Sequence, residues 1–217
     1  MDLDPRSLGV YVVTSAGRSG RGHEEIAAAA IEGGATALQL RAPELADEEL
    51  VAVGSRLAAR CHDAGVLFVV NDRADLALAC GADGVHVGQG DDPAGARGNL
   101  GPRPVLGISV RGVDEARDAH AAGADYLGVT VWATATKPEA EPGGIDGLRE
   151  VVEASPLPVV GIGGIDPANA AAVMSAGAAG VAVVSAVAAA RDPAAAVREL
   201  RRIVDGYRTT GGARRHG

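Results

Sequence analysis

Eight short β-rich runs alternate with longer alanine-rich segments along nearly the whole chain, and this alternation constrains the fold more than any other feature. Valine, leucine and isoleucine dominate the runs, as is typical of strands that a parallel sheet buries on both faces. We expect strands at Val10–Thr14, Ala37–Leu40, Leu67–Val70, Gly84–Val87, Val105–Ile108, Tyr126–Val129, Val159–Ile162 and Gly180–Val184. Eight strand–helix units in 217 residues favour one closed (β/α)8 TIM barrel over an open doubly wound sheet.

The segments between the strands have helical patterns. We expect helices at Glu24–Glu32, Glu48–Ala64, Ala74–Cys80, Val113–Ala122, Ala168–Ala176 and Ala194–Val204, and weaker ones near Pro93–Arg97 and Ile145–Ala154. Asp166-Pro167 and Asp192-Pro193 each place a capping carboxylate before a proline that suits the first helical position. No linker interrupts the pattern, so residues 1–208 form one expected domain. The Gly- and Arg-rich residues 209–217 lack an apolar face, and we expect a disordered tail there.

Composition and charge exclude several classes of protein. Aromatic residues make up only 2% of the chain, so small aliphatic side chains must build the core. The formal net charge of −8 argues against a nucleic-acid partner, because phosphates would be repelled. Two cysteines predict a reducing compartment rather than a disulfide framework. The chain has neither a signal-like N-terminus nor an apolar stretch of about 20 residues, so we expect a cytoplasmic protein without a membrane partner.

Polar residues and glycines follow nearly every expected strand. In a TIM barrel the carboxyl ends of the strands meet at one mouth, where active sites lie. The candidates, in strand order from the second to the eighth, are Gln39 and Arg41, Asn71 and Asp72, Asp91, Ser109, Thr134, Thr136 and Lys137, Gly164, and Val184 with Ser185. Their concentration at one end of the expected barrel predicts an active site there.

The glycine pair and the two cations at the mouth predict phosphate binding. Gly163-Gly164 follows the seventh expected strand and precedes a capped helix, so its backbone can approach an anion closely. Ser185 would add a donor to the same phosphate. Arg41 suits bidentate contact with phosphate oxygens, and Lys137 suits contact as a point charge. The alternatives are a tight turn for the glycines and surface ion pairs for the cations.

Two carboxylates at the mouth predict a magnesium site. Asp72 and Asp91 follow neighbouring strands, and Mg²⁺ binds one or two carboxylates together with substrate phosphate oxygens. A helix N-cap for Asp72 and a solvated loop charge for Asp91 are the alternatives. His86 lies inside the fourth strand, which favours a hydrogen-bonded core histidine over a base. With no nucleophile–base pair among the candidates, we expect catalysis by positioning and charge neutralisation.

The same residues lie in motifs that resemble the thiamine phosphate synthase family. The motifs run in order along the chain as QLR at Gln39–Arg41, ND at Asn71–Asp72, DGVHVGQGD at Asp83–Asp91, GIS at Gly107–Ser109, TATK at Thr134–Lys137, GIGGI at Gly161–Ile165 and VVSA at Val183–Ala186. Many phosphate-binding barrels share GIGGI, whereas DGVHVGQ followed by TATK is far more specific. The resemblance covers most of the chain.

The resemblance implies a reaction and a role for each candidate. It implies a transferase that joins 4-amino-5-hydroxymethyl-2-methylpyrimidine diphosphate to a thiazole phosphate and releases pyrophosphate through a carbocation. Arg41, Ser109 and Lys137 would be catalytic. The diphosphate substrate would be held by Gln39, Arg41, Asn71, Ser109 and Lys137, and the thiazole phosphate by Thr134, Thr136, Gly164, Val184 and Ser185. Asp72 and Asp91 would bind the Mg²⁺ cofactor.

The chain departs from the family pattern at two places. Pro43 stands where the family usually has a lysine, and the loop after the sixth strand is one residue shorter and lacks the usual Gly-Pro pair. Two other functions therefore stay open, a thiazole tautomerase that would need a base such as His86, and a non-catalytic phosphate-binding barrel. The Arg18–Arg21 segment is a candidate lid over the diphosphate or a plain surface loop. The sequence does not decide between a monomer and a homodimer.

Overall fold

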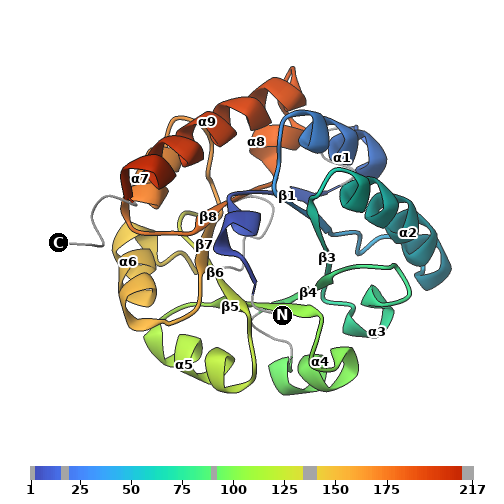
Figure 1. The fold of residues 1–217 in the computed structure, drawn as a ribbon, viewed down its shortest axis with the longest axis horizontal. Coiled ribbons are helices and arrows are strands. Elements are labelled where there is room, and N and C mark those ends of the chain that lie inside the picture. Colours follow the sequence, from blue (N-terminus) through green and yellow to red (C-terminus); the bar gives the residue numbers. More distant parts are fainter. Residues whose placement is uncertain (1–2, 16–19, 89–91, 134–140, 212–217) are drawn as a thin grey trace.

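Eight parallel strands close into a barrel in the order of the sequence, which confirms the expected fold (Figure 1). The computed structural model describes residues 3–15, 20–88, 92–133 and 141–211. The strands are β1 (Val10–Thr14), β2 (Ala37–Leu40), β3 (Leu67–Asn71), β4 (Gly84–Val87), β5 (Val105–Val110), β6 (Tyr126–Thr130), β7 (Val159–Ile162) and β8 (Gly180–Val183). Each strand pairs in parallel with both of its neighbours, and β8 closes the barrel on β1.

Helices surround the barrel as an outer ring (Figure 1). They are α1 (His23–Glu32), α2 (Asp47–Asp63), α3 (Ala74–Ala77), α4 (Pro93–Leu100), α5 (Val113–Ala121), α6 (Gly144–Ala154), α7 (Ala170–Ser175), α8 (Ser185–Ala188) and α9 (Pro193–Gly211). Asp192 caps α9 as expected, since its carboxylate accepts from the Ala195 amide at 2.9 Å. That helix continues to Gly211, beyond residue 208, where we expected the domain to end. Residues 212–217 of the expected tail lie outside the described residues.

The barrel contains two separate apolar cores. The larger one fills the space between the strands and the surrounding helices. The smaller one lies inside the barrel and consists of Leu8, Tyr11, Val13, Ala37, Tyr126, Val160 and Ala182. Two of the three tyrosines of the chain are thus inside the barrel, where large side chains fill a space that small aliphatic residues alone would leave open.

The amino-terminal segment closes the end of the barrel at which the strands begin. A 3₁₀ helix, η1 (Pro5–Leu8), lies across the centre of the ring in the orientation of Figure 1. Arg208 of α9 fixes this helix, because its guanidinium donates to the carbonyls of Pro5, Arg6 and Ala179 at 2.7–3.1 Å. The carboxyl ends of the strands therefore form the other, open end of the barrel, where a substrate can enter.

Both cysteines are buried, which determines their reactivity. Cys61 and Cys80 are 0% exposed, and burial together with the nearby Asp83 carboxylate raises the pKa of the Cys61 thiol to about 12. Because only the thiolate attacks a disulfide reagent, we expect both thiols to react at pH 8 no faster than the protein unfolds. Labelling with an aromatic disulfide in rising urea checks this. Rapid reaction of either thiol in the native protein would contradict the expected burial.

Among the described residues, no helix has the length and apolar character that a membrane span needs. The cytoplasmic location stays a prediction.

Candidate active site

A pocket opens at the carboxyl ends of the strands, as the barrel fold predicts. Its empty volume, including the solvent space at its mouth, is about 960 Å³. Seven of the expected site residues line it, namely Gln39, Arg41, Asn71, Ser109, Gly164, Val184 and Ser185. Four further expected residues, Asp91, Thr134, Thr136 and Lys137, lie outside the described residues, so their positions stay predictions. The pocket is also lined by Tyr11, His86, Tyr126 and Thr130, of which we had considered only His86, as a core residue.

The glycine pair after β7 packs too tightly for any side chain. Gly163 and Gly164 have positive φ angles of 89° and 64°, a region that glycine adopts without strain. A Cβ atom on Gly163 would lie 2.7 Å from the Trp132 carbonyl oxygen, and one on Gly164 would lie 3.0 Å from the Trp132 Cβ. Asn169 donates from its amide to the Gly164 carbonyl at 2.8 Å, which fixes the orientation of that peptide. Both glycines line the pocket, as does Ser185 at the start of α8.

A hydrogen-bonded cluster around His23 fixes the backbone of Arg41. The Arg41 amide donates to the Thr14 hydroxyl at 3.3 Å, and His23 contacts Thr14 Oγ1 and Glu44 Oε1, both at 2.8 Å. Burial acts to raise the pKa of the Glu44 carboxyl, but the hydrogen bond with His23 and the nearby Arg41 charge lower it overall. Our sequence reasoning missed His23, because it begins a helix and does not directly follow a strand. The cluster joins the carboxyl ends of β1 and β2 to the start of α1.

Arg21, part of the candidate lid, contacts neighbouring elements. Its guanidinium donates to the Ala188 carbonyl at 2.7 Å and to the Glu25 carboxylate at 3.0 Å. These contacts connect the segment before α1 to α8. Arg18 lies outside the described residues, so the lid stays a hypothesis.

Asp72 has a strained backbone directly after β3. Its φ of 62° makes it the one non-glycine residue with a positive φ in the described part of the chain. The strained turn is fixed by the Asp72 amide, which donates to the His86 carbonyl at 2.8 Å, and by the Ala74 amide, which donates to the Asp72 carbonyl at 2.9 Å. The N-cap position of α3 belongs to Arg73, so the alternative role that we considered for Asp72 is not observed. Backbone strain of this kind is concentrated at functional sites.

The ligands that this side of the pocket offers suit a hard cation. Asn71 lines the pocket with a carboxamide, whereas Asp72, the next residue, is exposed and is not among the residues that line the pocket. Both ring nitrogens of His86 contact other side chains, which leaves oxygen atoms as the available donors. No cluster of three or more His, Cys, Asp or Glu occurs among the described residues, as a transition-metal site would need. Mg²⁺ needs only one or two carboxylates, so these residues fit it.

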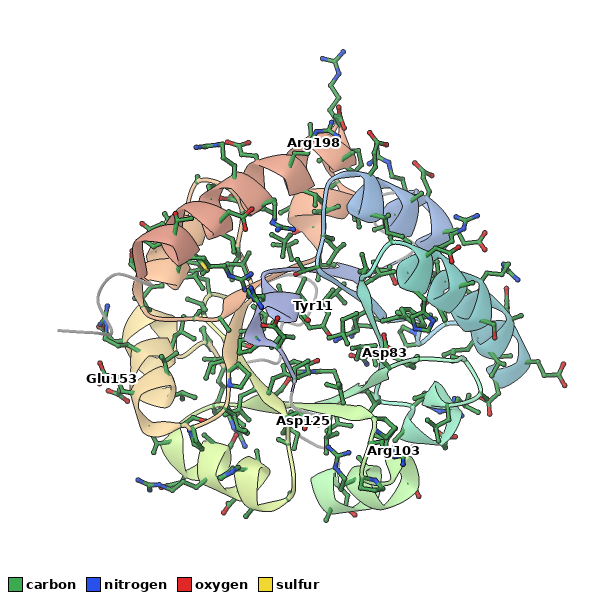
Figure 2. All side chains as sticks on the ribbon, in the orientation of Figure 1. Tyr11, Asp83, Arg103, Asp125, Glu153 and Arg198 are labelled. Carbon is green, nitrogen blue, oxygen red and sulfur yellow. The ribbon has the colours of Figure 1, made fainter. Side chains whose placement is uncertain are left out.

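Five side chains form a continuous hydrogen-bonded chain across the floor of the pocket. The Gln39 amide donates to the Tyr11 hydroxyl at 2.9 Å, and the hydroxyls of Tyr11 and Tyr126 are 2.9 Å apart. His86 connects Tyr126 to Ser109, with Nδ1 3.0 Å from the Tyr126 hydroxyl and Nε2 2.9 Å from Ser109 Oγ. Figure 2 shows Tyr11 at the centre of the barrel.

This hydrogen-bonded network corrects one of our expectations and bears on another. His86 lies inside β4 and is hydrogen-bonded, as expected, but it is half-buried and lines the pocket rather than the core. We expected no nucleophile–base pair, yet Ser109 and His86 lie at the distance that such a pair would have. The sequence did not indicate their contact, because the two residues are 23 positions apart on neighbouring strands.

Tyr11 and Tyr126, the two tyrosines of this hydrogen-bonded network, should resist ionisation. Burial raises the pKa of Tyr11 from its ordinary value near 10 to about 12, and burial also raises the pKa of Tyr126. A raised folded-state pKa stabilises the protein fully below about pH 10, and this stabilisation is lost as the pH rises toward 12. We therefore expect the urea midpoint to fall above pH 10. Phenolate absorbance at 295 nm should show two tyrosines that ionise only on unfolding, whereas full ionisation in the native state at pH 11 would contradict this.

Known proteins match nearly the whole chain. The profile of the family described as thiamine monophosphate synthase matches residues 10–187. The thiamine-phosphate synthase of Moorella thermoacetica is 52% identical over 200 residues, which are 91% of this chain and 95% of that protein. The corresponding protein of Chloroflexus aurantiacus is 50% identical over 198 residues, which are 90% of this chain and 92% of that protein.

A solved structure agrees with the sequence matches. Thiamine phosphate pyrophosphorylase from Pyrococcus furiosus superimposes with a TM-score of 0.87 at 40% identity, over 94% of this chain and 98% of that one. Sequence and fold thus agree, and the chain belongs to the thiamine monophosphate synthase family.

Proposed function

We propose that this chain is a transferase that makes thiamine phosphate and pyrophosphate from 4-amino-5-hydroxymethyl-2-methylpyrimidine diphosphate and 4-methyl-5-(2-phosphooxyethyl)thiazole. The observation that carries the proposal is one pocket with two differently equipped sides. Arg41, Asn71 and Ser109 come from β2, β3 and β5 or the residues after them, and the tightly packed glycines with Ser185 follow β7 and β8, which are other strands of the closed barrel. A chain that binds two phosphorylated substrates together needs two such sides. The relatives that are 50–52% identical bear the name of this activity.

The side formed by β2, β3 and β5 would bind the pyrimidine diphosphate. Arg41 presents a guanidinium that matches two oxygens of a phosphate, and the His23 cluster fixes its backbone. Gln39 and Ser109 supply amide and hydroxyl groups to the ring, and Asn71 supplies a carboxamide. Lys137 would add a second cation beside the diphosphate.

The loops after β7 and β8 would bind the thiazole phosphate. Gly164 lines the pocket in a backbone conformation that glycine adopts without strain, and Val184 and Ser185 add the start of α8 after the neighbouring strand. Thr134 and Thr136 would add hydroxyl donors from the loop after β6. This arrangement would hold the thiazole ring nitrogen toward the carbon that the diphosphate leaves.

Asp72 and Asp91 would hold Mg²⁺. When bound, the ion would neutralise charge on the pyrophosphate leaving group. The residues of the chain would do the rest by position and charge. Arg41 and Lys137 would stabilise the departing charge, Ser109 would orient the pyrimidine ring, and the pocket walls would exclude water from the carbocation until the thiazole nitrogen reacts. This dissociative reaction needs no general base.

A second candidate function is thiazole tautomerisation. The observation that favours it is His86, which lines the pocket 2.9 Å from Ser109 and would be the required base. This reaction needs neither the diphosphate nor a metal. The two functions therefore differ in what the protein requires for turnover.

The test is pyrophosphate release from the purified protein. We expect release that needs both substrates and Mg²⁺ and that falls at least tenfold in the Asp72→Asn variant. Asp114→Asn is the matched control, because Asp114 is an exposed carboxylate on α5 that pairs with Arg117. Metal-independent isomerisation of the thiazole phosphate without pyrophosphate release would favour the tautomerase. Tight binding of thiazole phosphate without any turnover would favour a non-catalytic barrel.

A further inference from the structure

We infer that Tyr11 and Tyr126 fix the direction of hydrogen bonding across the pocket floor, so that His86 carries its proton on Nε2 and Ser109 donates its hydroxyl proton into the pocket. The inference deepens the proposed function, on which its effect on substrate rests. The direction itself is a property of the free protein. The two tyrosines and His86 are positioning residues, because they act on substrate through Ser109.

The direction begins at Gln39. Its amide nitrogen can only donate, so the Tyr11 oxygen accepts this bond at 2.9 Å. Tyr11 is 2% exposed, and within the described part of the chain its one other partner is the Tyr126 hydroxyl. A hydroxyl carries a single proton, and a buried donor without an acceptor is strongly disfavoured. Tyr11 therefore donates to Tyr126.

The same reasoning continues at Tyr126, which is 0% exposed. Its oxygen accepts from Tyr11, so its own proton has one acceptor left, the Nδ1 atom of His86 at 3.0 Å. A neutral imidazole that accepts at Nδ1 carries its proton on Nε2. Nε2 therefore donates to Ser109 Oγ at 2.9 Å.

Ser109 then has a proton to donate. His86 Nε2 is the one partner of its hydroxyl among the described residues, and this bond uses the oxygen as an acceptor. The Ser109 proton is left for a ligand, since the residue lines the pocket. At the other end of the chain, the Gln39 amide oxygen has no partner in the described residues and is left to accept. An aminopyrimidine ring, which carries N–H donors and ring-nitrogen acceptors, matches this pair of groups.

The same direction removes His86 as a base toward Ser109. An Nε2 atom that already carries a proton cannot take one from the serine. The short Ser109–His86 contact, which resembles a nucleophile–base pair, is therefore a donor contact that orients the serine. The position of the proton on His86 therefore distinguishes a serine that orients substrate from a serine nucleophile, without an activity assay.

Histidine tautomers give distinct ¹H–¹⁵N correlation patterns, which test the inference directly in the free protein. We expect the Nε2–H pattern for His86 in the wild type and in Tyr11→Phe, where Tyr126 still donates to Nδ1. In Tyr126→Phe we expect a mixture of both tautomers, because Nδ1 has lost its donor. Tyr207→Phe, which removes a half-exposed hydroxyl on α9, is the matched control and should leave the pattern unchanged. His86→Gln assigns the resonances.

An Nδ1–H or doubly protonated His86 in the wild type at neutral pH would overturn the inference, and so would an unchanged pattern in Tyr126→Phe.

Steady-state kinetics gives a second readout. We expect Tyr126→Phe to raise KM for the pyrimidine diphosphate about fivefold, the loss of one oriented hydrogen bond, with KM for the thiazole phosphate unchanged. Equal changes in both KM values would indicate a general structural effect and contradict the positioning role. The spectra need no turnover, so failure of the proposed function leaves this test intact.

Discussion

Replacement of Arg41 by alanine is expected to lower kcat/KM for thiamine phosphate formation by about 10²–10³-fold. Arg41 is the one cationic side chain among the described residues that line the pocket. Its guanidinium would neutralise the diphosphate as the bond to the pyrimidine carbon breaks, when the charge on the leaving group grows. An interaction that strengthens in the transition state lowers kcat when it is removed, so the loss should appear largely in kcat.

Two further variants separate the charge of Arg41 from its geometry. Arg41→Lys keeps the charge but loses the planar fork, and we expect it to recover only part of the activity. Arg56→Ala is the matched control, because this arginine pairs with Glu24 on the outer helices and its side chain is 55% exposed. Steady-state kinetics with both substrates measures the three variants. An Arg41→Ala enzyme within threefold of wild type would show that the diphosphate binds elsewhere.

The absence of a lysine at position 43 should make this chain depend more strongly on Arg41. Pro43 is exposed in the turn after β2, where it offers no charge to a ligand. The His23 cluster fixes the same turn through Glu44 and through the Arg41 amide. A fixed backbone lowers the entropy that Arg41 loses when it binds the diphosphate, which offsets part of the missing contact.

The sequence was sufficient to predict the barrel because its local signals all agree. Each β-rich run became a strand, and seven of the eight strands match their expected bounds or differ from them by one residue at one end, whereas β5 runs two residues further. Helix ends were harder, as α9 shows. Arg208 belongs to the last turns of that helix and donates to carbonyls of Pro5 and Ala179, which are distant in sequence. Contacts of this kind prolong a helix without leaving any local pattern.

Some residues of the site could be predicted from their position in the sequence, and others could not. Gln39, Asn71 and Ser109 were found because polar residues at or near the carboxyl end of a barrel strand face the mouth. Tyr11 and Tyr126 lie earlier in their strands and resemble core residues. In a parallel barrel both faces of a strand are buried, so no alternation of polar and apolar residues separates the interior face from the exterior one. Only the three-dimensional contact between the hydroxyls of Tyr11 on β1 and Tyr126 on β6 revealed the hydrogen-bonded network.

Substitution of Gly107 by alanine is expected to destabilise the fold by about 3 kcal/mol, the upper end for an overpacked core. A Cβ atom at this position on β5 would lie 2.1 Å from the Tyr126 Cζ, well inside van der Waals contact. The ring of Tyr126 has no room to move, because it is fully buried and hydrogen-bonded at its hydroxyl. Urea denaturation measures the loss. Gly147→Ala on α6 is the control, since a Cβ there meets nothing within 4 Å and an alanine favours the helix by up to about 1 kcal/mol.

The cause of this loss can be isolated with a double variant. If the Tyr126 ring is the obstacle, Tyr126→Leu removes the atoms that the new methyl group would meet. The double variant Gly107→Ala/Tyr126→Leu should then lose less free energy of unfolding than the two single variants lose together, by about 1–3 kcal/mol. Additive losses would mean that the backbone of β5, and not the tyrosine, excludes a side chain at position 107. The barrel floor would then need glycine for the sheet itself, whereas coupled losses mean that it needs glycine in order to hold Tyr126 against His86.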